Sequence, residues 1–228
     1  MALNEMGFTV IDLPPVGEAF LASFDDLGFD EHSGGNHKYR RFSQYRMRYE
    51  GGRWRLELLP HRPYIAYSKY NTFAGGIRRH YPPLLIDPSD ILDAGAKAIP
   101  LDTEDDWQIN VHQYRIVTAP GIDGRVVPEG PHQDGHEYVM IAVFRRHDIT
   151  GAEMTLMPVG GGEPFFRTTL QEGQAALLHD EHMFHYVTDI KAVEERGHRD
   201  IIVVAFSRWA DRWYGPEFEA RALGGRAQ

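Results

Sequence analysis

The sequence predicts a mainly β protein (α+β) with a jelly-roll, cupin-like core and N-terminal helices and strands packed on it. From about residue 107 onward, short runs rich in Val, Ile, Tyr, Phe and Thr follow one another with glycine turns between them. No convincing helical pattern interrupts these runs, whereas the first 106 residues mix helical and strand patterns. Many short strands beside a mixed extension are typical of a sandwich or barrel with a buttress.

Each element is predicted from a local pattern. One helix is predicted within 14–27, where apolar residues at helical spacing follow Pro14 and Pro15. A second helix is predicted over 87–98, which begins with the start signal Asp-Pro-Ser. Runs of β-branched and aromatic residues bounded by turn signals predict strands. The expected strands are 39–49, 53–59, 62–69, 107–118, 136–146, 152–158, 164–170, 174–179, 184–190 and 199–208.

The chain is expected to form a single domain. No repeat, low-complexity tract or long polar linker divides its 228 residues. Within 1–228, residues 1–106 would form the buttress and a substrate lid, and 107–208 the jelly-roll core. Residues 209–228 would be a C-terminal tail that frays over 220–228.

The composition excludes several classes of function. The chain has no cysteine, which removes disulfides, thiolate zinc sites, iron–sulfur clusters and cysteine nucleophiles. Its longest apolar runs are far shorter than the roughly 20 residues that a membrane span needs, and its N-terminus lacks the pattern of a signal peptide. We therefore expect a cytoplasmic protein with no membrane partner. The oligomeric state is left open, a homodimer included.

The charge balance argues against nucleic acid as a partner. The formal net charge is −9, whereas nucleic-acid binding draws most of its free energy from Lys and Arg side chains that neutralise phosphates. Six arginines between residues 40 and 55 do alternate with aromatic residues, as in some RNA-binding surfaces. We interpret them as the solvated face of a strand pair, from which one or two arginines could bind an anionic small molecule.

Twelve histidines are the unusual feature of the composition. A non-haem Fe(II) site needs two imidazoles and one carboxylate on one side of the metal, with the other positions open. A His-x-Asp pair supplies two of these ligands, because residues i and i+2 of a strand point to the same side. Chance predicts about one such pair, and the chain has two, His132–Asp134 and His198–Asp200. Spacing alone therefore does not identify the site.

The surroundings of the two pairs differ. His132 and Asp134 follow a strand and a Gly/Pro-rich loop and precede an apolar strand, which places them at the rim of the barrel. No histidine follows His198 and Asp200. Between the two pairs, a strand, a polar turn and a second strand offer three candidates for the third ligand: His179, His182 and His185.

Four short strings in this region resemble the 2-oxoglutarate/Fe(II)-dependent dioxygenases of double-stranded β-helix fold. They are Gly-Pro-His-Gln-Asp-Gly at 130–135, Leu-Leu-His-Asp at 177–180, His-Tyr-Val-Thr-Asp-Ile at 185–190 and Arg-Asp-Ile-Ile-Val-Val at 199–204. The chain looks most like the bacterial branch that hydroxylates free L-amino acids, of the isoleucine 4-hydroxylase type. The resemblance covers 107–208, and more loosely 40–42 and 71–82. Asp189 stands where the family usually has proline.

The resemblance implies roles for particular residues. His132, Asp134 and His185 would hold Fe(II), and the planar guanidinium of Arg199 would bind the distal carboxylate of 2-oxoglutarate. The implied reaction uses O₂, releases succinate and CO₂, and hydroxylates a small, aliphatic free L-amino acid. Ascorbate is the expected reductant in vitro.

Other residues are candidates for completing the binding site. Gln113 and Tyr114 could contact the co-substrate and Arg115 the substrate. Only alternate residues of their strand face inward, and the sequence does not determine which. Arg40 and Arg79, which lie among aromatic residues of the first half, are candidates for binding the carboxylate of an amino acid.

Two other functions fit the same fold. One is a cupin-like metalloenzyme that does not use 2-oxoglutarate, and the other is a non-catalytic cupin-type module that binds a small molecule. Arg199 argues against the first, since only a 2-oxo diacid needs a cation opposite the iron. Dependence on a metal would argue against the second.

Overall fold

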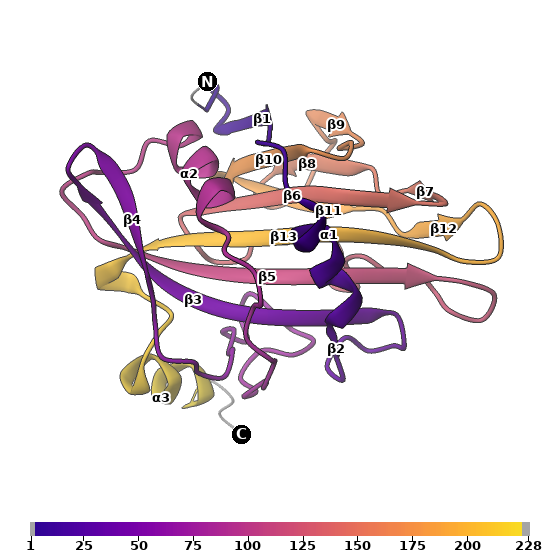
Figure 1. The fold of residues 1–228 in the computed structure, drawn as a ribbon, viewed down its shortest axis with the longest axis horizontal. Helices are drawn as coiled ribbons and strands as arrows, with labels where there is room; N and C mark the ends of the chain where they lie inside the picture. The colour runs from indigo at the N-terminus through magenta and orange to yellow at the C-terminus, as the bar shows by residue number, and fades with distance from the viewer. Residues whose placement is uncertain (1–2, 225–228) are drawn as a thin grey trace.

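A long antiparallel sheet and a smaller sheet make up the protein, whose computed structural model describes residues 3–224. The long sheet has the strand order β1-β10-β6-β13-β5-β3-β2, and β4 pairs with β3 outside this path (Figure 1). These antiparallel sheets confirm the predicted jelly-roll architecture. The strands of the long sheet are β1 (Phe8–Asp12), β2 (Gly28–Phe29), β3 (Lys38–Glu50), β4 (Arg53–Leu58), β5 (Trp107–Thr118), β6 (Tyr138–His147), β10 (Gln174–His179) and β13 (Gly197–Arg208).

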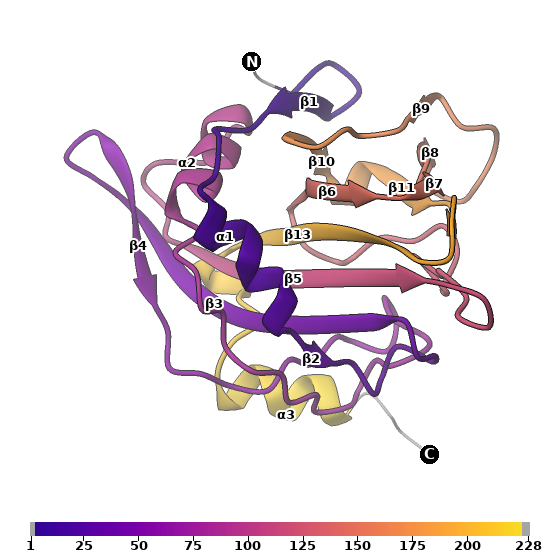
Figure 2. The ribbon, with the colours of Figure 1, turned by 45° about the vertical axis from the view of Figure 1, so that its right-hand side comes forward.

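The smaller sheet has the order β11-β8-β9, and a separate two-stranded ladder joins β12 to β7. Figure 2 shows β8, β9 and β11 together at the upper right of the molecule. These strands are β7 (Ile149–Gly151), β8 (Met154–Pro158), β9 (Phe166–Thr168), β11 (Met183–Val187) and β12 (Ile190–Ala192).

Residues 18–26 and 89–98, which form three of the helices, cover the other face of the long sheet. Phe24, Ile91 and Leu92 are buried there in one core with residues of β5, β6 and β13. None of the helices within residues 3–224 is long and apolar enough to span a membrane. The helices are α1 (Glu18–Ala22), η1 (Ser23–Asp26), α2 (Ser89–Ala98), η2 (Asp180–His182), η3 (Trp209–Asp211) and α3 (Pro216–Gly224).

Alternation along β13 and β5 determines which side chains face the smaller sheet. Val204 and Phe206 pack in the helix-side core, whereas Ile201 belongs to the core between the sheets. Arg199 has the same parity as Ile201 and lines the same cavity. The β5–β13 ladder aligns Ile201 with Tyr114, so Tyr114 faces the smaller sheet too.

Two predicted strands differ from the structure. Residues 62–69 form no strand: Pro63 has no N–H to donate, and only the isolated bridge between Tyr64 and Arg79 pairs there. The strand expected over 184–190 is divided into β11 and β12. Thr188 and Asp189 lie between the two, where they bond to Glu153 and Val126 instead of continuing one ladder.

The expected fraying of residues 220–228 is wrong for the part that the structure describes. Residues 220–224 belong to α3, and Phe218 and Ala222 of this helix are buried against Trp213 and Ile65. The helix therefore docks through an apolar face, as C-terminal segments do when they stay ordered. Residues 225–228 lie outside the described part of the chain.

An ion pair on the helix side of the sheet joins β5, β13 and η1. Asp200 is fully buried and accepts hydrogen bonds from Arg115 Nε at 2.7 Å and Nη2 at 2.8 Å. The same guanidinium donates to Asp25 at 2.6 Å, and Asp25 is exposed. The bidentate geometry with a buried carboxylate makes Asp200 the stronger partner.

We predict that Asp200→Ala lowers the free energy of unfolding by about 3–5 kcal/mol, because the Arg115 guanidinium loses its buried, bidentate partner and keeps only the exposed Asp25. Asp25→Ala is the matched control on the same guanidinium and should cost less than about 1 kcal/mol, as exposed pairs do. Urea unfolding measures both values. Equal losses for the two variants would contradict the assignment of Asp200 as the dominant partner.

Candidate metal centre

Two backbone hydrogen bonds hold the two histidines of the site side by side. His132 lies in the loop before β6, and His185 lies in the middle of β11. The His132 N–H donates to the His185 carbonyl at 3.1 Å, and the His185 N–H donates to the His132 carbonyl at 3.0 Å. This isolated antiparallel bridge fixes the separation of the two side chains, whose ring centroids lie 4.4 Å apart.

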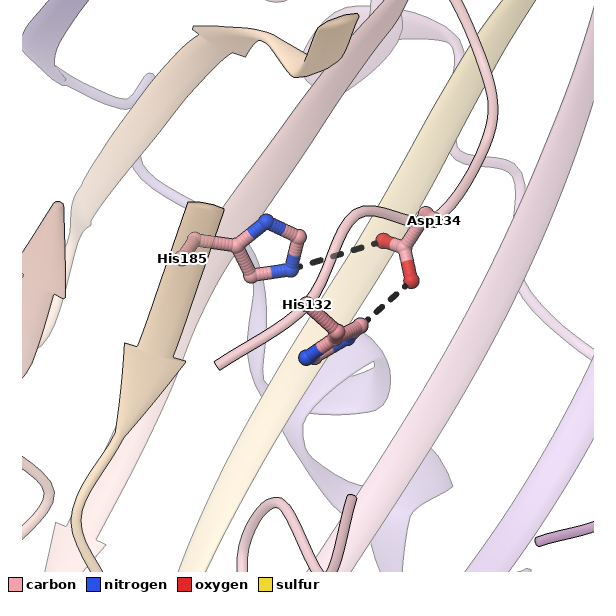
Figure 3. A group of neighbouring side chains, drawn as sticks. All are labelled: His132, Asp134 and His185. Atoms are coloured by element: carbon pink, nitrogen blue, oxygen red, sulfur yellow. Dashed lines mark ion pairs between the residues drawn. The ribbon is translucent and has the colours of Figure 1, made fainter. Parts of the chain in front are cut away.

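Asp134 completes a cluster of two imidazoles and one carboxylate (Figure 3). One nitrogen from each of His132 and His185 and one oxygen of Asp134 lie within 4.8 Å of one another. His132 Nε2 is 3.4 Å from Asp134 Oδ1, and His185 Nε2 is 3.7 Å from Oδ2. Two nitrogen atoms and one oxygen converging on a point are the ligand set of the facial triad that binds Fe(II).

Hydrogen bonds outside the cluster orient these ligands. His132 Nδ1 lies 3.0 Å from the carbonyl of Gly130, which can only accept, so Nδ1 carries a proton and Nε2 is the ring nitrogen that faces the cluster. The carboxylate of Asp180 accepts the N–H groups of Asp134 and Gly135 at 3.1 Å and 2.7 Å. Gly135 has φ of 85°, and a Cβ there would lie 2.3 Å from the Tyr70 ring. Only glycine therefore fits this turn.

The charges of the cluster stabilise one another. Burial lowers the pKa of His132, but the hydrogen bond and charge of Asp134 outweigh this effect and raise that pKa to about 9. Burial raises the pKa of Asp134, but His132 and His185 outweigh it and hold that pKa far below its usual range. A carboxylate that stays ionised is the form that can bind a metal ion.

Arg199 lies in the same cavity as the cluster and has no hydrogen-bond partner among residues 3–224. The side chain of Arg199 is 1% exposed, and none of its three guanidinium nitrogens makes a hydrogen bond within the described chain. Burial, with a smaller contribution from the charge of Arg146, lowers its pKa to about 9. A buried cation of this kind is costly unless an anion pairs with it, so Arg199 is suited to bind a carboxylate.

A second group of charged residues forms the outer wall of this cavity of about 150 Å³. Arg40 donates to the fully buried Asp30 at 2.5 Å and stacks between two rings, with its guanidinium carbon 4.2 Å from Tyr81 and 4.5 Å from Tyr114. Its charge is thus already neutralised. Arg79 is buried too, but Asp30 and the other described carboxylates make no ion pair with it, and its Nε and Nη2 have no hydrogen-bond partner.

The structure brings some predicted residues to the cavity and not others. Tyr114 lines it, as do Arg40 and Arg79. Gln113 and Arg115 do not, because neighbouring strand residues face opposite sides. The Gln113 amide donates to Ser23 at 2.7 Å, and Arg115 binds Asp200 and Asp25, all on the helix side.

Sequence analysis did not identify four charged residues that shape this site. Asp180 anchors the loop that carries Asp134, while Asp30, Lys38 and Glu129 line the cavity. Burial lowers the pKa of Lys38 to about 8. They lie in loops or at strand ends, and only the folded chain brings them to His132. The one signal for Asp180 in the sequence was its place directly after a strand of apolar residues.

The fold and the site together define a class of protein: a jelly-roll enzyme with a two-histidine, one-carboxylate metal centre. A family model described as 2OG-Fe dioxygenase matches residues 21–205, and the chain belongs to this family. The protein is therefore an oxygenase that uses Fe(II) and 2-oxoglutarate. The cluster of His132, Asp134 and His185 and the unpaired guanidinium of Arg199 fit these two groups.

Solved structures share the fold. A BsmA homolog from Methylobium petroleophilum PM1 is 28% identical, with a TM-score of 0.74 and 89% of each chain covered. IDO from Bacillus thuringiensis is 20% identical, with a TM-score of 0.68 over 89% of this chain and 94% of that chain. The Fe(II)/α-ketoglutarate-dependent dioxygenase TqaL is 15% identical, with a TM-score of 0.54 over 85% and 76%. None of the curated proteins compared with this chain matches it.

We predict that Fe(II) binding depends on His132, Asp134 and His185 and not on His182. Replacing any one of the three by alanine leaves two ligands, too few for a stable site, so titration of the apoprotein with Fe(II) under anaerobic conditions should show no tight binding. His182→Ala is the control: His182 is exposed and stacks on His179 at 3.7 Å. Full metal binding in His185→Ala would contradict the assignment.

Proposed function

We propose that this oxygenase hydroxylates a small, aliphatic free L-amino acid and uses His132, Asp134 and His185 to hold the iron. The observation that carries this proposal is the presence of two buried arginines with unpartnered nitrogens, Arg199 and Arg79, in the cavity of the metal cluster. Two carboxylates must enter such a cavity for its charges to be paired. One belongs to 2-oxoglutarate and the other to the substrate.

Arg199 is the partner for 2-oxoglutarate in this proposal. Arg199 lines the cavity together with the metal cluster and the apolar side chains of Ile201, Val203 and Ile141. In this proposal one end of the diacid lies at the metal cluster, and its distal carboxylate pairs with Arg199 in the bidentate geometry that guanidinium favours. When bound, iron and 2-oxoglutarate activate O₂ for insertion of one oxygen atom into a C–H bond, with release of succinate and CO₂.

Arg79 is a better partner than Arg40 for the carboxylate of the substrate. Arg40 is already paired with Asp30, so a second carboxylate would gain little from it. The guanidinium carbon of Arg79 lies 4.5 Å from the centroid of the Tyr64 ring, and its backbone forms the bridge with Tyr64. This pairing holds the guanidinium in place while Nε and Nη2 stay available.

Glu129 is the proposed acceptor for the ammonium group. Its carboxylate lines the cavity and accepts a hydrogen bond from Asn71 Nδ2 at 3.1 Å. Among residues 3–224 no basic side chain forms an ion pair with it; Lys38 contributes an electrostatic interaction, and its Nζ donates to the Val126 carbonyl at 2.7 Å. An unpaired carboxylate and an unpaired guanidinium in one cavity match the two charges of a zwitterion.

The apolar part of the cavity supports an aliphatic side chain. Val126, Val127 and Val187 line it from the loop before the metal ligands and from β11. Phe73 and Ala74 belong to the segment between β4 and α2 and line it from the outside. This segment is the lid in our proposal, and by covering the bound substrate it would exclude water during the reaction.

We predict that Arg199→Ala raises the KM for 2-oxoglutarate by roughly 30- to 5,000-fold, since removing one partner of a buried charged pair costs about 2–5 kcal/mol. The melting temperature of the apoprotein should not fall, because the variant also removes an uncompensated buried charge. Succinate formation measures the KM. Arg167→Ala, which removes a half-exposed cation on β9, is the control. A change below about threefold in Arg199→Ala would show that another cation binds the co-substrate.

We predict that mass spectrometry finds a product with one added oxygen atom from a free aliphatic L-amino acid incubated with Fe(II), 2-oxoglutarate and ascorbate. For that substrate, Arg79→Gln should raise the KM by roughly 10- to 150-fold, the loss of about 1.5–3 kcal/mol from one charged hydrogen bond. The KM for 2-oxoglutarate should stay unchanged. If only peptides or N-acyl derivatives turn over, the proposed substrate class is wrong.

A further inference from the structure

We propose that Asp180 is a positioning residue of the metal centre, which orients two of the three ligands without binding the metal itself. The residue lies at the end of β10, where η2 begins, and its side chain is fully buried. It contacts both chain segments that carry the proposed ligands: the loop of Asp134 and the strand of His185.

The first contact is with the loop that carries Asp134. The carboxylate accepts the Asp134 N–H at Oδ1 and the Gly135 N–H at Oδ2, at 3.1 Å and 2.7 Å. The Gln133 amide also donates to the Asp180 carbonyl at 2.7 Å, and the Asp180 N–H donates to the Glu137 carbonyl at 3.1 Å. Four hydrogen bonds therefore connect one residue to a loop of five, and they fix the backbone from which the ligand carboxylate projects.

The second contact is with the other ligand segment. Oδ1 of Asp180 lies 3.5 Å from His185 Nδ1, and this buried nitrogen has no hydrogen-bond partner among the described residues. Asp180 is the acceptor toward which an Nδ1–H group would point. That tautomer leaves the lone pair of Nε2 directed at the cluster, where Nε2 faces Asp134 at 3.7 Å. A carboxylate behind a ligating histidine fixes ring orientation and increases the basicity of the ligand.

The charge of Asp180 gives it an effect beyond holding the loop. Among residues 3–224 no lysine or arginine lies within 4.0 Å of this carboxylate; His185 is its one ion-pair partner. A buried carboxylate without a cation is costly. A divalent ion held by His185 and Asp134 would supply the missing positive charge, so part of the cost is relieved only when the metal binds. Asp180 should therefore increase metal affinity, whereas a purely structural anchor would affect folding alone.

The test compares Asp180→Asn with the wild-type protein, with Co(II) or anaerobic Fe(II) as the titrant. Asparagine keeps the volume and one acceptor for the loop, but it removes the charge. We expect the dissociation constant for the metal to rise by roughly 10- to 100-fold, the usual effect of losing such a partner. The visible absorption of bound Co(II), which reports its coordination geometry, should change as well. The melting temperature of the apoprotein should fall by no more than in the Asp200→Asn control, although the asparagine NH₂ group cannot accept the second loop N–H.

Asp200→Asn is the matched control, because Asp200 is an equally buried carboxylate at a distance from the metal cluster. This variant should lose stability and keep the wild-type metal affinity. A dissociation constant of Asp180→Asn within threefold of wild type would overturn the proposal. An equal loss of affinity in both variants would do so too, since it would reflect general destabilisation.

A measurement on the wild-type protein keeps the proposal testable if Asp180→Asn does not fold. Nitrogen-15 NMR of the Zn(II)-loaded protein identifies which ring nitrogen of each histidine carries a proton. The His185 ring should show a protonated Nδ1 with the downfield shift of a hydrogen bond to a carboxylate. A proton on Nε2 of His185, with Nδ1 bound to zinc, would overturn the assignment.

Discussion

Charge that is buried without a partner is the constraint on which this structure depends. Within residues 3–224, Arg199 and Arg79 are buried with unpaired nitrogens. The buried carboxylate of Asp180 accepts two backbone N–H groups but has only His185 as a charged partner, whereas Arg40 is neutralised by Asp30. Unpaired buried charge opposes folding, and the two apolar cores on either face of the long sheet must offset that cost. In the proposed function the same cost falls when iron, 2-oxoglutarate and the carboxylate of the substrate bind. The free energy that these unpaired charges cost the folded protein is thus recovered when the binding partners arrive, and it increases their affinity.

The cluster of His132, Asp134 and His185 and most strands of the second half could be predicted because most of their signals are local. His132 and Asp134 follow a turn-rich loop, which is a local signal, whereas local patterns left three histidines open as the third member and only the family resemblance favoured His185. On β5 the sequence predicts that Gln113 and Tyr114 face opposite sides of the sheet. Only the ladder with β13 shows which of these sides holds the cavity. Once Arg199 is placed inside, Asp200 and its partner Arg115 must lie outside.

Asp180 and Glu129 could not be predicted, because they reach the site through contacts that exist only in the folded chain. Asp180 and Gly135 are 45 positions apart, and Asn71 and Glu129 are 58 apart. No periodic pattern links such pairs. The segment after β4 was misread for a related reason: its aromatic residues suggest a strand, yet Tyr67 packs at 5.0 Å on Trp213 and at 5.4 Å on Phe218, near the other end of the chain. Tertiary packing decided its conformation where local propensity favoured an alternative.

The regular ladder between β5 and β13 has a consequence for how this chain can change length. Its register runs without a shift from Gly197 to Arg208, whereas the ladder between β6 and β13 skips one residue of β6 beside Asp200. Inserting or deleting one residue in β13 next to this point would exchange the two faces of the strand. It would place the carboxylate of Asp200 in the cavity, where we propose that the co-substrate carboxylate binds, and Arg199 among the helices. Descendants of this sequence can therefore vary the side chains of β13 far more freely than its number of residues.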